Sequence, residues 1–292
     1  MAKVSILMNC YNGEKYLKET VDSVMAQTYE DWELIFWDNQ STDKTAEIIH
    51  GYNDERIKYF YASEFTSLGE ARNLGIEKCS SEWIACLDSD DLWDKEKLER
   101  SFLALEKYEE KENVSLIYSL SNMIDEESNV FSKTEKAPSG DIHEQLLIEG
   151  NFIVFSSLIF RKDISKYYGN IDSNLQFCTD YDLLLKITKK YQAVGVKRCL
   201  TGYRIHSNNI TSIKTYVNTI ETVNLLKKYI IENNPSLKIK FNIFINNSYR
   251  LSSAFVKLFL DKEYKNVGKL FRQNSILLLF SPFAIIYKKI GD

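Results

Sequence analysis

The sequence predicts an α/β protein with a mainly parallel sheet flanked by helices, followed by a helical C-terminal extension. Over about the first 120 residues, short apolar stretches alternate with amphipathic stretches of about 10–15 residues, the pattern of βαβ units. Only 3 prolines and 11 glycines interrupt 292 residues, which favours long regular elements. The hydrophobic fraction of 44% is normal for a packed chain.

The first part of the chain gives the strands and helices in a regular order. Predicted strands cover residues 4–8, 32–37, 56–62, 83–87 and 114–119. Predicted helices cover residues 14–28, 43–52 and 94–108, and a further one runs from Ser67 or Gly69 to residue 79. Ligands of such sheets bind beyond the carboxyl ends of the strands. The loops after the first, second and fourth strands are therefore candidate site segments.

After residue 120 the pattern is less regular. It predicts a turn at 125–129, helices at 141–149 and 179–191, strands at 153–161 and 193–200, and helices from residue 216 onward. Residues 215–292 carry a net charge of +7, whereas the rest of the chain carries −11. The split predicts an acidic catalytic body followed by a basic appendage.

Composition excludes several classes of protein. The five cysteines form no C-x-x-C pair, which indicates a reducing cytoplasm. With 37 basic against 41 acidic residues, the overall charge does not suggest nucleic-acid binding. The N-terminus lacks the apolar region of a signal peptide, and no stretch approaches the roughly 18 apolar residues of a membrane span. We therefore expect a cytoplasmic protein without a transmembrane segment.

The loop after the fourth strand concentrates negative charge. Asp88, Asp90 and Asp91 follow the apolar stretch 83–87 directly. Carboxylates in this arrangement favour Mg²⁺ or Mn²⁺, which commonly bridges one or two of them to substrate phosphates. The alternative is a solvated turn that caps the helix starting near Asp94.

The loops after the first two strands carry groups suited to a nucleotide base. Tyr11 offers a ring for stacking, and Asp38 offers an acceptor for a base edge. Taken alone, each loop also fits a structural interpretation. Asn12-Gly13 is a turn sequence, and Ser41-Thr42-Asp43 is a helix cap.

Six segments in order resemble family 2 glycosyltransferases of GT-A fold, a Rossmann-like architecture. The resemblance covers about residues 3–212. The segments are Tyr11-Asn-Gly, Asp38-x-x-Ser-Thr-Asp, Gly69-x-Ala-Arg-Asn-x-Gly, Asp88-Ser-Asp-Asp with the later Thr179-Asp-Tyr-Asp, and Tyr203-Arg-x-His. Asn9-Cys10, Asn39-Gln40 and Thr179 replace the more usual Pro-Thr, Asp-Gly and Glu of the family.

The resemblance implies a role for each matching residue. Tyr11, Asp38 and Arg72 hold the nucleotide base, Asp88 lies near the donor ribose, Asp90 binds Mg²⁺ or Mn²⁺, and Asp180 is the catalytic base. His206 ligates the metal or hydrogen-bonds the diphosphate; a surface or packing role is its alternative.

The implied reaction is inverting, metal-dependent transfer of a sugar from a nucleotide sugar, with a UDP-sugar favoured. The acceptor is a hydroxyl of a glycan or of a lipid-linked glycan, and the implied role is bacterial surface polysaccharide synthesis. A non-catalytic nucleotide-sugar-binding module is the first alternative. A sugar nucleotidyltransferase is the second, although residues 9–14 lack its glycine-rich triphosphate loop.

The predicted domains are a catalytic domain at 1–213 and a helical extension at 214–292. Within the first, 1–120 binds the nucleotide sugar and 121–213 supplies the base and the acceptor site. In the extension, the apolar stretch 276–280 precedes a helix opened by Ser281-Pro282, with Phe283, Ile286, Tyr287 and Ile290 on one face. This tail is expected to touch the inner face of the membrane peripherally, and packing on protein is the alternative.

Overall fold

The computed structural model describes residues 3–164, 171–207, 209, 215–260 and 274. By internal contacts, the chain divides into two compact units. The first comprises Met1–His143 and Asn151–His206, and the second comprises Glu144–Gly150 and Ser207–Asp292. The predicted catalytic range 1–213 included Glu144–Gly150, which this division assigns to the second unit. The predicted tail helix after residue 280 lies outside the described residues.

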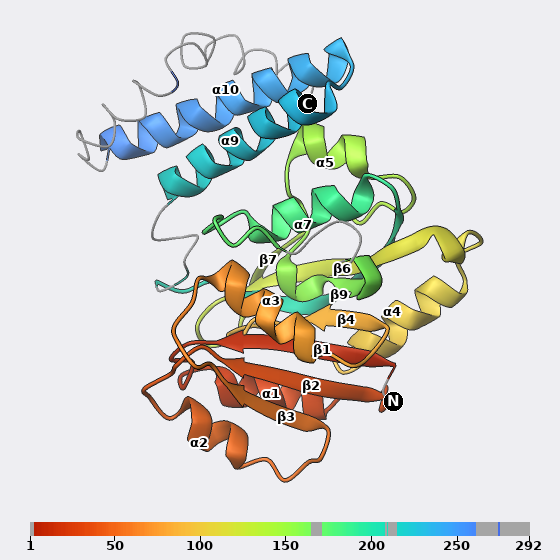
Figure 1. The fold of residues 1–292 in the computed structure, drawn as a ribbon, viewed down its shortest axis with the longest axis vertical. Helices are drawn as coiled ribbons and strands as arrows, with labels where there is room; N and C mark the ends of the chain where they lie inside the picture. The colour runs from red at the N-terminus through yellow and green to blue at the C-terminus, as the bar shows by residue number, and fades with distance from the viewer. Residues whose placement is uncertain (1–2, 165–170, 208, 210–214, 261–273, 275–292) are drawn as a thin grey trace. The chain divides into compact units, whose positions relative to one another are not determined.

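One sheet forms the centre of the first unit (Figure 1). Within the described residues it has nine strands in the order β3-β2-β1-β4-β8-β6-β9-β5, with β7 paired to β6. The strands are β1 (Val4–Cys10), β2 (Trp32–Asp38), β3 (Ile57–Tyr61), β4 (Trp83–Cys86), β5 (Leu92–Trp93), β6 (Val114–Ile124), β7 (Val130–Lys133), β8 (Ile159–Arg161) and β9 (Gln192–Arg204).

The strand directions confirm an α/β fold whose sheet is parallel in its first half and mixed beyond it. From β3 to β4 every neighbouring pair is parallel. β8 then runs antiparallel to both β4 and β6, whereas β6 and β9 are parallel. The predicted strand 153–161 shortens to β8 because a 3-10 turn, Phe155–Ser157, precedes it. Both the amide and the hydroxyl of Ser157 bond to the Val154 carbonyl, which favours this turn over an extended strand.

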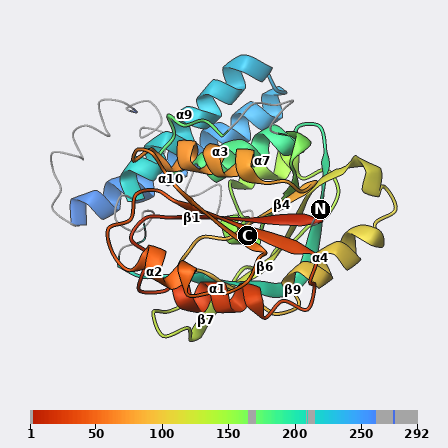
Figure 2. The ribbon, with the colours of Figure 1, turned by 60° about the horizontal axis from the view of Figure 1, so that its bottom comes forward.

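Helices cover both faces of the sheet (Figure 2). One face packs against α1 (Leu17–Met25), α2 (Thr45–His50) and α4 (Lys97–Glu106), whose buried side chains join one apolar cluster with alternate residues of β1 and β2. The other face carries α3 (Leu68–Lys78) and α7 (Thr179–Thr188). Alternation along β1 explains the two layers, since Val4, Ile6 and Met8 point toward α1 and the side chain of Leu7 meets α3.

Helix α3 packs closely on β1 at a glycine. A Cβ atom at Gly75 would lie 2.5 Å from Cδ1 of Leu7, so a larger residue would force either the Leu7 side chain or the helix to shift. Helix α3 is capped by Ser67, whose Oγ accepts a hydrogen bond from the Glu70 amide. Together these contacts fix where α3 presents Arg72.

The loops after β1 and β2 bind one another through polar contacts. The Asn39 amide donates to the Cys10 carbonyl at 2.8 Å, and the Thr42 amide donates to Oδ1 of Asn12 at 2.8 Å. Asn12 has a φ of 54°, a left-handed conformation that asparagine tolerates. Hydrogen bonds therefore join the loop after β1 to the loop after β2 at this edge of the sheet.

The second unit is helical. It contains most of α5 (His143–Glu149) with α9 (Thr215–Asn233) and α10 (Leu237–Leu260). The helices α9 and α10 enclose a small apolar cluster of Val223, Leu251 and Ala254, and Nδ2 of Asn246 donates to the Ile148 carbonyl at 2.6 Å. Among the helices that the structure describes, none is both long and apolar enough to cross a membrane.

Candidate active site

Three loops at one edge of the sheet carry most of the predicted site residues. They follow β1, β2 and β4, and β1 is paired in parallel with both of the other strands. Their carboxyl ends are therefore neighbours. Asp38 ends β2, and Asp88 and Asp90 lie in the loop after β4.

Asp88 binds the arginine of α3. Nη2 of Arg72 donates to Oδ1 of Asp88 at 3.0 Å, and Nη1 donates to Oγ1 of Thr179 at 2.7 Å. The buried guanidinium also lies 3.5 Å from the centroid of the Phe155 ring, a cation–π contact. Arg72 thereby connects Asp88 to the start of α7, the helix that carries Asp180.

The environment of Asp88 is strongly negative. Burial, together with the charges of Asp90 and Asp180, raises the pKa of Asp88, and Arg72 offsets only part of this effect. The side chain nevertheless remains 31% exposed, so a ligand has access to it. Carboxylates that repel one another at an accessible edge are stabilised when a cation binds.

Asp90 and His206 contact each other. Nε2 of His206 lies 2.9 Å from Oδ2 of Asp90, and the side chain of Asp90 is 30% exposed. This carboxylate oxygen and imidazole nitrogen suit Mn²⁺ or Mg²⁺. Their separation is that of a hydrogen bond between the two side chains.

Asp90 and His206 alone would supply only part of a coordination shell. In the part of the chain that the structure describes, no three His, Cys, Asp or Glu side chains are grouped to hold a metal ion by themselves. Mg²⁺ and Mn²⁺ are often bound through one or two protein ligands, with water and substrate phosphates completing the shell. The residues present fit an ion that is shared with a ligand.

Asp91 differs from its neighbours in the same loop. It is buried, its Oδ1 accepts from the Arg204 amide at 2.8 Å, and its Oδ2 accepts from the Ser156 hydroxyl. Ser156 Oγ also accepts from the Asp88 amide at 3.0 Å. Burial, with the charges of Asp90 and Asp88, raises the pKa of Asp91 well above its ordinary value. Asp91 therefore holds the loop together from inside.

The first turn of α7 presents two acids with different partners. Oδ2 of Asp180 accepts from Nδ2 of Asn151 at 2.8 Å, and burial raises the pKa of Asp180 although Arg72 lowers it in part. Asp182 instead forms an ion pair with Lys186 at 2.6 Å, one turn along the helix. Of the two acids, Asp180 is the one whose charge acts on Asp88.

Two of the three predicted base-binding residues, Tyr11 and Asp38, lie in different environments, and a contact of the third, Arg72, with a base also stays a prediction. Tyr11 is 52% exposed and meets the exposed Phe65 edge to face, with ring centroids 4.9 Å apart. Asp38 is fully buried, and its two oxygens accept from the Ser41 amide and the Tyr59 hydroxyl, each at 2.7 Å. A contact between Asp38 and a base stays a prediction, whereas its bonds to the Ser41 amide and to the Tyr59 hydroxyl of β3 are present.

Four residues of this edge were not predicted as site residues. Phe65, Asn151 and Ser156 carry no recognisable signal in the sequence. Arg204 lies in the quoted segment Tyr203-Arg-x-His, but only its contacts reveal that it binds the loop of Asp90.

Comparisons with known proteins identify the family of the chain. Residues 5–168 match the family model described as glycosyl transferase family 2. TuaG of Bacillus subtilis (strain 168), a glycosyltransferase whose name refers to teichuronic acid biosynthesis, is 30% identical over 215 residues, covering 72% of this chain and 82% of TuaG.

Two solved structures share the fold at low sequence identity. TarS 1–349 of S. aureus in complex with UDP-GlcNAc has a TM-score of 0.68 and 18% identity, covering 86% of this chain and 73% of that one. Mannosyltransferase PcManGT from Pyrobaculum calidifontis, in complex with GDP-Man and Mn²⁺, has a TM-score of 0.64 and 13% identity, covering 97% of this chain and 84% of that one. The family match, the relative and the shared GT-A fold lead to one conclusion: the chain belongs to glycosyltransferase family 2.

Proposed function

We propose that this glycosyltransferase transfers a sugar, with inversion, from a UDP-sugar to a hydroxyl group of a glycan or lipid-linked glycan, and that it requires Mg²⁺ or Mn²⁺. The observation that carries the proposal is the chain of contacts through Arg72. It connects Asp88, beside the Asp90–His206 pair, to the helix turn that presents Asp180. UDP-GlcNAc and Mn²⁺ are bound by two proteins of the same fold.

In the proposed reaction Asp180 is the base. Its raised pKa makes the carboxylate a better proton acceptor than an ordinary aspartate, and Asn151 fixes one of its oxygens. As the acceptor oxygen bonds to the anomeric carbon, its proton moves to Asp180. The bond from that carbon to the diphosphate oxygen breaks, and the nucleoside diphosphate leaves with the electron pair.

Other residues bind the donor. Asp90 and His206 hold the divalent ion, which when bound offsets the negative charge of the diphosphate. Asp88 faces the ribose, and Tyr11 with Asp38 forms the base end of the site. The exposed ring of Tyr11 supports a stacking role.

The decisive experiment is a donor-hydrolysis screen over nucleotide sugars with Mg²⁺ or Mn²⁺. We expect a UDP-sugar to be hydrolysed, excess chelator to stop the reaction, and Asp90→Asn to lower the rate by about 100-fold or more. Asp94→Asn is the matched control, since Asp94 is an exposed acid four positions on whose carboxylate caps a neighbouring turn. Full turnover in excess chelator contradicts the metal requirement, and donor binding without any product favours a binding module.

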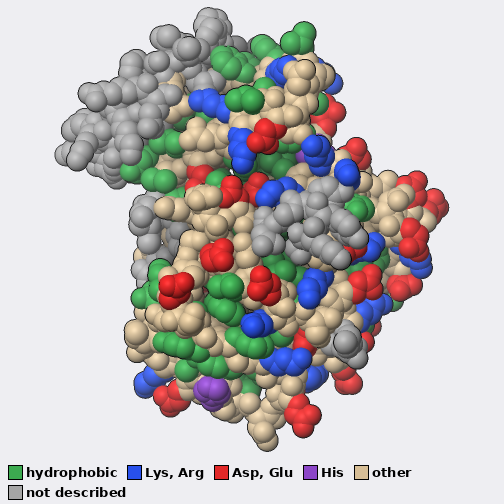
Figure 3. Space-filling view, viewed as in Figure 1, with side chains coloured by type: hydrophobic (Ala, Val, Ile, Leu, Met, Phe, Trp, Pro, Cys, Tyr) green, Lys and Arg blue, Asp and Glu red, His purple; other side chains and the backbone are tan. Residues whose placement is uncertain are grey.

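We also propose that the second unit contacts the inner face of the cell membrane. Ile231 and Leu237 are 81% and 83% exposed near the turn between α9 and α10. Hydrophobic and basic side chains lie next to each other on this helix pair (Figure 3). The net charge of +7 over residues 215–292 would attract anionic lipids.

Flotation on vesicles that contain anionic lipid tests this contact at low and high salt. Ile231→Ser with Leu237→Ser should weaken flotation, whereas Val130→Ser, at an exposed apolar residue of β7, should not. Equal flotation of the three proteins, or none with wild type, contradicts the proposal.

A further inference from the structure

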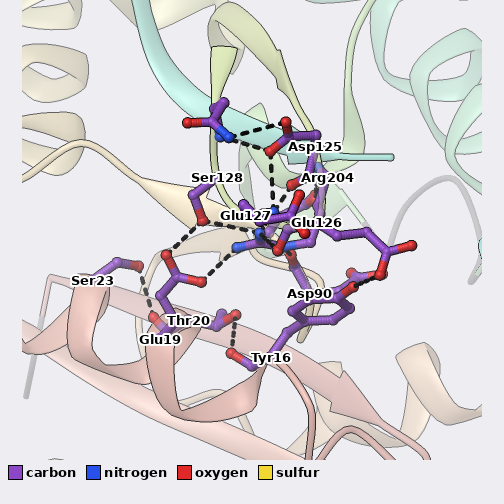
Figure 4. Close-up of polar contacts among 12 residues, drawn as sticks. Tyr16, Glu19, Thr20, Ser23, Asp90, Asp125, Glu126, Glu127, Ser128 and Arg204 are labelled. Carbon is purple, nitrogen blue, oxygen red and sulfur yellow. Dashed lines mark hydrogen bonds and ion pairs between the residues drawn. The ribbon is translucent and has the colours of Figure 1, made fainter. Parts of the chain in front are cut away.

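The end of β9 carries a completely buried arginine, Arg204 (Figure 4). Its Nη2 donates to Oε2 of Glu19 at 2.7 Å, and its guanidinium lies 4.5 Å from the centroid of the Tyr16 ring. The Glu19 side chain is 49% exposed, so its charge is shared with water. A guanidinium removed from water is unfavourable unless its remaining donors are also bonded.

Those remaining donors reach two loops. Nε donates to the Asp90 carbonyl at 2.9 Å, and Nη1 donates to the carbonyls of Asp125 and Glu126, both at 3.1 Å, and to Oγ of Ser128 at 2.9 Å. Figure 4 shows the arginine surrounded by these groups. All three side-chain nitrogens are therefore engaged, and they tie the Asp90 loop to the turn between β6 and β7.

The same short segment also binds the acidic side chains. The Arg204 amide donates to Oδ1 of Asp91 at 2.8 Å, and His206, two positions on, contacts Oδ2 of Asp90 at 2.9 Å. Holding the Asp90 carbonyl fixes the plane of the following peptide. That plane sets the direction in which the Asp90 side chain leaves the backbone, and thus where its carboxylate meets His206.

Only arginine has the donors for this set of contacts. Its planar group presents five N–H bonds in fixed directions, whereas lysine offers three around a single nitrogen. A lysine at this position could not reach Asp90, Glu19 and the turn at 125–128 together. These contacts suit a residue that fixes the position of the Asp90 loop relative to the turn at 125–128.

We propose that Arg204 is a positioning residue for the cation site: by holding the Asp90 carbonyl, it keeps the Asp90 carboxylate and the His206 ring directed at the same ion. This rests on the proposed function, because it takes a divalent ion to be bound at Asp90. A second effect follows at the turn. Oε2 of Glu126 accepts from Lys15 and from the Tyr16 hydroxyl, so the turn that Arg204 holds also braces the residues beside His206.

The test measures Mn²⁺ affinity in the full chain by electron paramagnetic resonance, with UDP present and without turnover. Arg204→Lys and Arg204→Met should weaken Mn²⁺ binding by about 10- to 100-fold, the usual effect of removing a group that orients a metal ligand. Glu19→Gln, at a half-exposed position that does not endanger folding, should weaken it about threefold. Binding of UDP alone, without metal, should change less than twofold in each variant.

Lys97→Met is the matched control for loss of a buried cation. Lys97 is also fully buried, and its Nζ donates to Oγ of Ser119 and to the Ser157 carbonyl, neither of which belongs to the Asp90 loop or to the turn at 125–128. Its Mn²⁺ affinity should match wild type. If every folded Arg204 and Glu19 variant binds Mn²⁺ as wild type does, the positioning role is wrong and the proposed function stands. If wild type itself binds no Mn²⁺ with UDP, the metal part of the proposed function fails.

Discussion

Asp38 and Asp90 lie at the same edge of the sheet, yet the two acids differ in burial and in their hydrogen-bond partners. Asp38 is fully buried and both of its oxygens accept from the protein's own donors. Asp90 is 30% exposed, and its Oδ2 contacts His206. An acid whose acceptors are used by its own chain fixes loops, whereas a partly exposed acid beside other acids suits a cation.

The same contrast recurs twice within short distances. In the loop after β4, Asp91 is buried and bonded by Ser156, whereas Asp88 stays accessible. In α7, Asp182 pairs with Lys186, whereas Asp180 is bonded by a neutral amide. Each time, one acid is bonded within the fold, and its neighbour is the acid to which we assign a chemical role.

The largest effect is expected when the two acids of α7, Asp180 and Asp182, are replaced in turn. Asp180→Asn should lower donor hydrolysis by about 10²- to 10⁴-fold, because the amide accepts no proton from the attacking oxygen. Donor affinity should stay within twofold, since the base acts on the acceptor. Asp182→Asn is the control and should leave the rate nearly unchanged. Rates are measured at saturating donor, and affinity by calorimetry.

Two outcomes would contradict the assignment of Asp180 as the base. If Asp182→Asn stops the reaction and Asp180→Asn does not, the base has been assigned two residues from its true position. If Asp180→Asn instead weakens donor binding and leaves turnover intact, Asp180 belongs to the donor site.

The sequence predicts much of the first half of this fold because the first four strands are short and largely apolar. The alternation of apolar stretches and helical faces places β1 to β4 and α1 to α4 within a few residues of their observed bounds. It misses β5, a two-residue strand, and β7, whose four residues are all exposed. Exposed or very short strands are set by their pairing partners, which a local pattern does not contain.

The site is predictable to the level of residue type and order. The Asp88–Asp91 loop, Arg72 and Asp180 are all visible in the sequence, yet Asp91 looks the same as Asp90 there. What separates them is a hydroxyl from Ser156, 65 positions away, and an amide from Arg204, 113 positions away. Contacts between such distant segments exist only after the sheet has formed.

A smaller effect is expected for the buried acid of the first comparison. Asp38→Ala should lower the free energy of unfolding by about 1–3 kcal/mol, because the Ser41 amide and the Tyr59 hydroxyl both lose their acceptor. Asp90→Asn should leave stability unchanged or slightly raise it, since it removes one of several repelling charges. Urea unfolding of both variants measures the difference. If both variants lost the same free energy of unfolding, the distinction between a structural Asp38 and a ligand-binding Asp90 would be wrong.

The smallest expected effect is a pH dependence of stability caused by Lys97. This side chain is fully buried, and its Nζ is bonded to neutral oxygens. Burial lowers the pKa of Lys97 from 10.5 to about 7. Between pH 7 and 10.5 the unfolded chain therefore binds more protons at this residue than the folded chain does, so its contribution to stability rises with pH. Below pH 7 both states are charged and the full penalty of burial remains.

Lys97→Met should remove this dependence. From pH 7 to pH 8 wild type should gain about 1 kcal/mol of unfolding free energy relative to the variant, because each pH unit is worth 1.36 kcal/mol per proton and the folded lysine is half charged at pH 7. Taking the difference between the two proteins cancels the cysteines, which titrate in the same range. A constant difference across this interval, measured by urea unfolding, would mean that Lys97 stays charged inside the fold and that neutral oxygens alone satisfy a buried cation.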